Sequence, residues 1–189
     1  MLELKTLFVT SFCIVMVMCL LNFLTWRANK NTPGTLLFVF YPLLIFLALA
    51  LFKFHNHENG WEDYALSFGY LLLFLASIIQ AIALCRFFQF KHLSLTLFLI
   101  ATLWLSVTFN WFLFGDNNLH ARILIYDLQR IIEGVFVSYL FIQVALKRYP
   151  NASIIYLIHC CLLIAIFSLR TLLLKDLTSE EIIKDGWFS

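Results

Sequence analysis

Six long apolar stretches fill most of this sequence, and they constrain its fold more than any other feature. A helix that crosses a membrane needs about 20 mostly apolar residues, and each stretch reaches that length. Only 13% of the residues are charged, against about 25% in soluble domains. The sequence therefore predicts a polytopic membrane protein. The stretches cover residues 6–26, 35–54, 64–85, 93–114, 122–146 and 152–174.

The spanning elements should be helices. Lipid offers the backbone no hydrogen-bond partners, so only helices or a closed barrel can cross it. Barrel strands are about 10 residues long and alternate in polarity, and these stretches are longer and do not alternate. We predict an all-α protein with six transmembrane helices in three hairpins. Residues 1–174 would form this module, and residues 175–189 an outer interfacial tail.

Basic residues in the connectors predict the orientation. The connectors after the first, third and fifth stretches each hold two basic residues and no acid. Because Lys and Arg accumulate in short cytoplasmic loops, these three connectors should be cytoplasmic. The N-terminus and the C-terminal tail should then lie outside. The six basic residues are Arg27, Lys30, Arg86, Lys91, Lys147 and Arg148.

The fifth stretch carries charges where lipid would disfavour them. Asp127, Arg130 and Glu133 follow one another at three-residue intervals, so they form one ridge along a helix. A charged side chain near the membrane centre costs at least about 2.5–3.5 kcal/mol. The ridge must therefore face protein or water rather than lipid.

The rise of 1.5 Å per residue estimates the depth of each charge. Asp127 would lie about 7–8 Å below the outer end of its helix, and Glu133 about 16 Å. Arg170, on the antiparallel sixth stretch, would lie about 6 Å deep, at the level of Asp127, and His159 about 20 Å deep. We predict a buried cluster with His159 at its base, which Asn110 and Tyr126 could complete. The predicted ligand-sensing or coupling residues are Arg122, Asp127, Arg130, Glu133, His159 and Arg170.

Two interpretations of this cluster stay open. It is either an ion-pair network that only fixes helix packing, or a pocket open to the outer face that binds a small ligand or responds to protons.

Other kinds of site have little support in the sequence. No phosphate-binding loop, nucleophile elbow or other catalytic motif is present, so we expect no enzyme activity. We also expect no metal site and no cofactor, because His55 and His57 fall in one polar loop and only His159 lies clearly within a stretch. The net charge of +2 gives no reason to expect nucleic-acid binding. The lipid bilayer is the partner that the composition implies.

Several segments resemble a known family. These are TWRANKNTPG after the first stretch, WEDYALSFGYLLLFLASIIQAIALCRFF in the third, an Arg opening the fifth, and SLRTLLL closing the sixth. Together they resemble the multi-span N-terminal membrane region of bacterial diguanylate cyclases, the GGDEF-domain proteins. The matching positions are Trp26, Arg27, Pro33, Gly34, Arg86, Phe87, Arg122 and Arg170.

The resemblance implies a non-catalytic sensory or anchoring module in a bacterial inner (cytoplasmic) membrane. It also implies a cytoplasmic signalling output domain as partner, a homodimer, and a link to cyclic di-GMP. The sequence departs from the family in two ways, because it ends before the expected further span and lacks the GGDEF motif. The cyclase activity therefore does not carry over, and both a fragment and a free-standing relative of the sensor stay open.

Two further functions remain as alternatives. A small transporter or channel needs polar residues along a path to both faces of the membrane. Few such residues lie between the level of Glu133 and the predicted cytoplasmic face. An integral-membrane enzyme would have to use Glu133 and His159.

Overall fold

The computed structural model describes residues 2–54, 62–90, 93–116, 118–148 and 150–174, and all its regular elements are helical. Six helices are long and apolar enough to cross a membrane, which confirms the predicted all-α, six-span class. The predicted tail at 175–189 and the His55–His57 loop lie outside the described residues. The elements are α1 (Leu2–Ala28), α2 (Thr35–Phe54), α3 (Glu62–Phe87), α4 (Leu93–Phe114), α5 (Leu119–Leu140), the π-helical η1 (Phe141–Ala145), α6 (Leu146–Arg148) and α7 (Pro150–Leu174).

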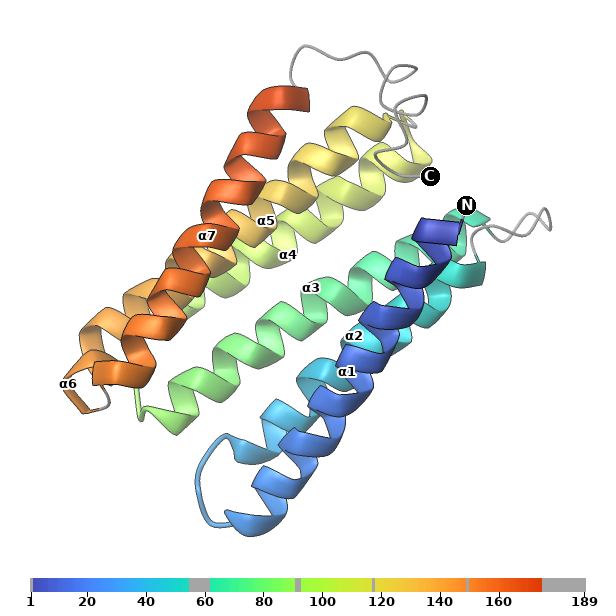
Figure 1. Cartoon of the computed structure of the whole chain (residues 1–189). Helices are drawn as coiled ribbons and strands as arrows, with labels where there is room; N and C mark the ends of the chain where they lie inside the picture. The colour runs from blue at the N-terminus through green and yellow to red at the C-terminus, as the bar shows by residue number, and fades with distance from the viewer. Residues whose placement is uncertain (1, 55–61, 91–92, 117, 149, 175–189) are drawn as a thin grey trace. The chain divides into compact units, whose positions relative to one another are not determined.

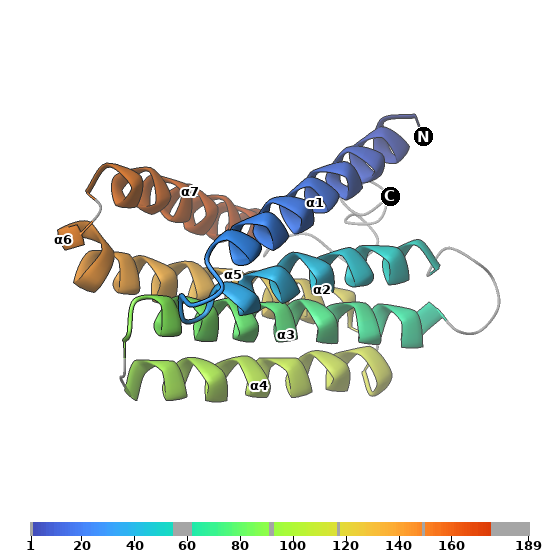
Figure 2. The ribbon, with the colours of Figure 1, turned by 90° about the horizontal axis from the view of Figure 1, so that it is seen from below.

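The helices form two compact units, Met1–Lys91 and His92–Ser189. In the first unit α2 packs against both α1 and α3 and runs between them (Figure 2). Small side chains let these helices approach closely, since Ala48, Ala76 and Ala83 are buried. At Gly69 the ring of Phe52 fills the space that a side chain would need.

A polar contact between α1 and α2 compensates for a proline. Pro42 lies inside α2 and cannot donate the helical hydrogen bond to the carbonyl of Phe38, four residues earlier. The side-chain amide of Asn22 in α1 donates to that carbonyl instead, at 2.9 Å. Because an unsatisfied backbone group in lipid costs several kcal/mol, this bond lets α2 keep its proline at membrane depth.

We expect Asn22→Leu to destabilise the first unit by about 0.6–1.7 kcal/mol, which runs from the average to the largest contribution measured for hydrogen bonds between membrane helices. The free energy of unfolding in a detergent titration measures it. Pro42→Ala restores a backbone donor to the Phe38 carbonyl, so Asn22→Leu should cost much less in that background. An equal cost in both backgrounds would contradict the compensation, and Asn31→Leu in the exposed turn is the control.

The turn between α1 and α2 depends on a glycine. Gly34 has a φ of +86°, which is left-handed backbone that favours glycine. The single hydroxyl hydrogen of Thr35 is shared between the carbonyl oxygens of Thr32, at 2.9 Å, and Asn29, at 3.2 Å. A Cβ at Gly34 would lie 2.5 Å from the carbonyl oxygen of Ala83 in α3. The turn falls between the predicted apolar stretches 6–26 and 35–54.

In the second unit α5 packs against both α4 and α7 and lies between them (Figure 1). The rings of Phe98 and Phe136 stack between α4 and α5, with centroids 4.6 Å apart. Gly134 brings α5 and α7 close together, because a Cβ there would lie 2.8 Å from Cγ1 of Ile164. The side chain of Asn118 caps α5 by accepting from the backbone N–H of Ala121 at 3.0 Å.

Two of the three predicted hairpins pack as expected, since α1 contacts α2 and α5 contacts α7. The third, α3 with α4, falls across the boundary between the two units. The predicted stretch 122–146 differs in one respect, because its last part is the π-helical η1 rather than regular α-helix.

Candidate functional site

An ion pair joins α5 to α7. Asp127 is fully buried, and Arg170 engages both of its carboxylate oxygens. Nε of Arg170 donates to Oδ2 at 2.9 Å, and a terminal guanidinium nitrogen donates to Oδ1. The hydroxyl of Thr171 also donates to Oδ2, at 3.4 Å. Asp127 and Arg170, which the sequence places at the same depth in one cluster, are therefore paired, with the bidentate geometry that favours arginine over lysine.

A second ion pair lies within α5. A guanidinium nitrogen of Arg130 donates to Oε2 of Glu133 at 2.7 Å. The two side chains are only 16% and 11% exposed. Their three-residue spacing places them on neighbouring turns of one face, as the sequence predicts.

The ring of Tyr126 lies beside both guanidinium groups. Its centroid is 5.1 Å from Cζ of Arg130 and 6.0 Å from Cζ of Arg170. These distances are within the range of cation–π attraction. Cζ of Arg170 is also 5.4 Å from the ring of Phe167. Tyr126 thus connects the two ion pairs into one group. We call it the outer cluster, after the side of the membrane that the sequence predicts for it: Tyr126, Asp127, Arg130, Glu133, Arg170 and Thr171.

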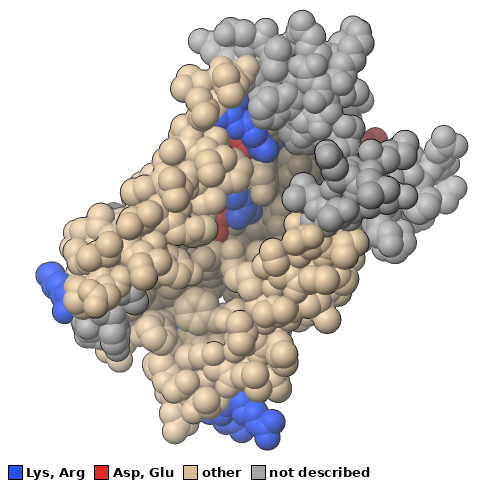
Figure 3. Space-filling model, in the orientation of Figure 1, with Lys and Arg blue, Asp and Glu red and all other residues tan. Residues whose placement is uncertain are grey.

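The outer cluster is visible on one face of the second unit. In Figure 3 basic and acidic residues lie side by side over α5 and α7, and the described surface directly around them carries no other charged residue. Two cations and two anions balance in the cluster, so the helices carry no net charge from it. This neutrality suits a low-dielectric surrounding, where an uncompensated charge is most costly.

The structure places two predicted site residues differently. His159 is exposed on α7, and its ring lies edge-on to Tyr156 with centroids 6.4 Å apart. It is therefore not at the base of a buried cluster. Arg122 lies in the first turns of α5 and is half-buried. It precedes Asp127 by five residues, which turns it by about 140° around the helix. Asn110 donates to the carbonyl of Ser106 in its own helix, at 2.9 Å.

The sequence interpretation missed a buried polar contact on the opposite side of α5. Gln129 and Thr102 are both fully buried, and Nε2 of Gln129 donates to the Thr102 hydroxyl at 3.2 Å. The available signal was an amide in the middle of an apolar stretch, two residues after Asp127. Polar bonds therefore hold α5 on both sides, to α4 through Gln129 and to α7 through Asp127.

Nothing in the described part of the chain suggests a metal centre, because no three His, Cys, Asp or Glu side chains converge there. Comparison with protein-family models, curated proteins and solved structures finds no match to this chain. What the sequence and the fold support together is a multi-pass membrane protein with six membrane-spanning helices.

Proposed function

We propose that this chain is a non-catalytic transmembrane sensory or anchoring module in a bacterial inner membrane, in which the outer cluster couples α5 to α7. The observation that supports this most is the Asp127–Arg170 pair, with a fully buried carboxylate held by another helix. The resemblance of TWRANKNTPG and SLRTLLL to the membrane region of diguanylate cyclases supports the same role. The chain would pass its signal to an output domain that it contacts or precedes.

The coupling follows from the cost of separating the pair. Removing one partner from a buried ion pair costs about 3–5 kcal/mol, so α5 and α7 move together while the pair is intact. A ligand or a proton can shift the equilibrium between two arrangements of α5 and α7 only if it binds one arrangement more tightly than the other. A small polar ligand or a proton that competes for Asp127 or Arg170 meets this condition. Competition at the outer cluster would therefore release α7 from α5.

An enzyme role finds less support in the geometry. Glu133 is paired with Arg130, and His159 is exposed beside Tyr156, so no acid–base pair is available between them.

A transport role also finds less support. Two polar side chains in the middle of α5, Gln129 and Glu133, already bond to Thr102 and Arg130.

The test measures the distance between α5 and α7 in lipid nanodiscs. Spin labels are placed on a cysteine-free chain at Leu128 and Leu169, which are 46% and 58% exposed. We expect one main distance in the unsubstituted protein. Asp127→Asn keeps the shape of the side chain but removes its charge, so a second, longer distance should become populated.

The control is Asp116→Asn, which removes an exposed acid after α4 and should leave the distances unchanged. Circular dichroism confirms that both variants keep their helix content. A single, identical distance in the unsubstituted protein and in Asp127→Asn would show that the pair does not control the arrangement. The module would then be a passive anchor.

A further inference from the structure

A groove of about 490 Å³ runs between α4 and α5. Such a volume falls within the range of small-molecule sites. Three of its lining side chains are largely exposed, Leu97 at 59%, Val135 at 54% and Tyr139 at 41%. The stacked rings of Phe98 and Phe136 form part of its wall. The lining residues are Leu97, Phe98, Ala101, Ile131, Ile132, Val135, Phe136 and Tyr139.

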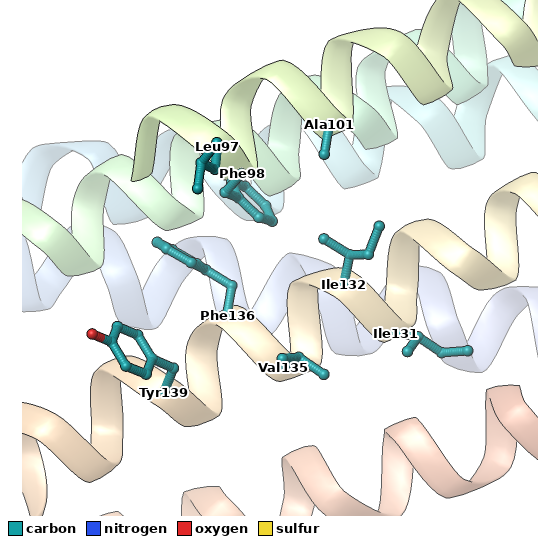
Figure 4. A pocket seen from close by; sticks show the side chains of 8 residues that line it. All are labelled: Leu97, Phe98, Ala101, Ile131, Ile132, Val135, Phe136 and Tyr139. Carbon is teal, nitrogen blue, oxygen red and sulfur yellow. The ribbon is translucent and has the colours of Figure 1, made fainter. Parts of the chain in front are cut away.

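The groove is apolar along most of its length and polar at one end. Tyr139 is the one lining residue with a polar side-chain atom. Figure 4 shows its hydroxyl pointing along α5, away from the other labelled side chains and toward the end that leads to α6. From Ile131 to Tyr139 the groove extends about 12 Å, at 1.5 Å per residue. It therefore suits a long, thin apolar chain with a polar group at the α6 end.

The π-helical segment brings a positive charge to the same end. Lys147 is exposed in α6, eight residues after Tyr139. In a regular α-helix eight residues exceed two turns by about 80°, which would direct Lys147 away from the groove. A π turn accommodates one more residue than an α turn, so η1, at Phe141–Ala145, absorbs this excess. Lys147 then lies on the same side of the helix as Tyr139, about 12 Å further along the axis.

We infer that this groove binds an anionic phospholipid of the leaflet at the α6 end. One acyl chain lies against Val135 and the two stacked rings, while the phosphate lies near Tyr139 and Lys147. The groove is within the membrane-spanning windows of α4 and α5, where acyl chains are the surrounding solvent. Lys147 lies two residues beyond the membrane-spanning window that ends at Ala145, so its ammonium group would favour an anionic headgroup over a zwitterionic one. This inference does not depend on the proposed sensory role.

The experiment measures lipid retention by native mass spectrometry on the full chain. The protein is released from nanodiscs that contain equal amounts of phosphatidylglycerol and phosphatidylcholine with identical acyl chains. We expect the anionic lipid to be retained about fivefold better, since one lysine near an anionic headgroup contributes about that factor. Lys147→Ala should abolish the preference. Val135→Phe should fill the groove and lower retention of both lipids.

Two matched controls accompany these variants. Lys30→Ala removes an exposed lysine that lies near Trp26, and Val107→Phe enlarges a 70% exposed side chain of α4 outside the groove. Neither should alter retention. Equal retention of the two lipids by the unsubstituted chain, or an unchanged preference in Lys147→Ala, would overturn the inference. Dimerisation that Val135→Phe abolishes, without any lipid preference, would overturn it in favour of a second copy in the groove.

Discussion

Arg170→Ala should lower the free energy of unfolding by about 3–5 kcal/mol, the usual cost of leaving one partner of a buried ion pair alone. Asp127 is fully buried and receives donors from Arg170 and Thr171. The alanine removes the positive charge and both guanidinium donors to the Asp127 carboxylate. The bilayer core holds no water that could donate in their place. A detergent titration of the reconstituted protein measures the loss. Arg170→Lys should recover only part of it, because an ammonium group cannot reproduce the two-pronged contact.

A double variant separates the cost of an orphaned charge from a general loss of packing. Asp127→Leu with Arg170→Met replaces both partners by apolar side chains, a change that is often neutral or stabilising for buried pairs. It should therefore be far more stable than Arg170→Ala. Arg27→Ala removes an exposed arginine at the end of α1 and should cost little. If Arg170→Ala behaves like Arg27→Ala, the pair holds neither the fold nor a signalling arrangement.

Gly34→Ala should destabilise the first unit by about 2–5 kcal/mol. The left-handed φ of +86° costs an alanine about 1–2 kcal/mol. The new Cβ would also lie 2.5 Å from the carbonyl oxygen of Ala83, and relieving such overpacking costs about 1–3 kcal/mol more. The neighbouring atom belongs to the backbone of α3, so it cannot move aside by changing a rotamer. The unfolding titration of the full chain measures the sum.

Gly34→Asn separates the two contributions, because asparagine tolerates left-handed backbone better than alanine but still carries a Cβ. It should retain most of the steric cost and lose most of the conformational one. Asn31→Ala, in the exposed part of the same turn, is the control for loss of a turn side chain. Full stability in Gly34→Ala would mean that the turn can withdraw from α3 freely.

The sequence predicted the helices and the shared depth of Asp127 and Arg170 for identifiable reasons. Polar or helix-breaking residues bound every apolar stretch, so the predicted ends lie close to the observed ones. α5 begins at Leu119 instead of 122 because Asn118 caps it. Depth along antiparallel helices was sufficient to place Arg170 level with Asp127. The three-residue spacing was sufficient to place Arg130 and Glu133 on one ridge, where the structure pairs them.

Depth does not fix the direction of a side chain around its helix, and this explains the remaining differences. His159 is exposed because the close contact of Gly134 with Ile164 turns another face of α7 toward α5. The segment FIQVA carries no sequence signal for a π-helix, so η1 was not predicted. The contact of Gln129 was not predicted because its place in the sequence does not show that its amide faces Thr102 on α4. The orientation in the membrane and the sensory role stay predictions.

The hydrogen bond from Asn22 to the carbonyl of Phe38 has a consequence for biosynthesis. Until the first helix stands beside it, the second carries an exposed carbonyl at Phe38, caused by Pro42. The second helix should therefore leave the insertion machinery less readily by itself than together with the first. The opening pair of helices would enter the bilayer as one unit, which fixes their register before the rest of the chain is translated.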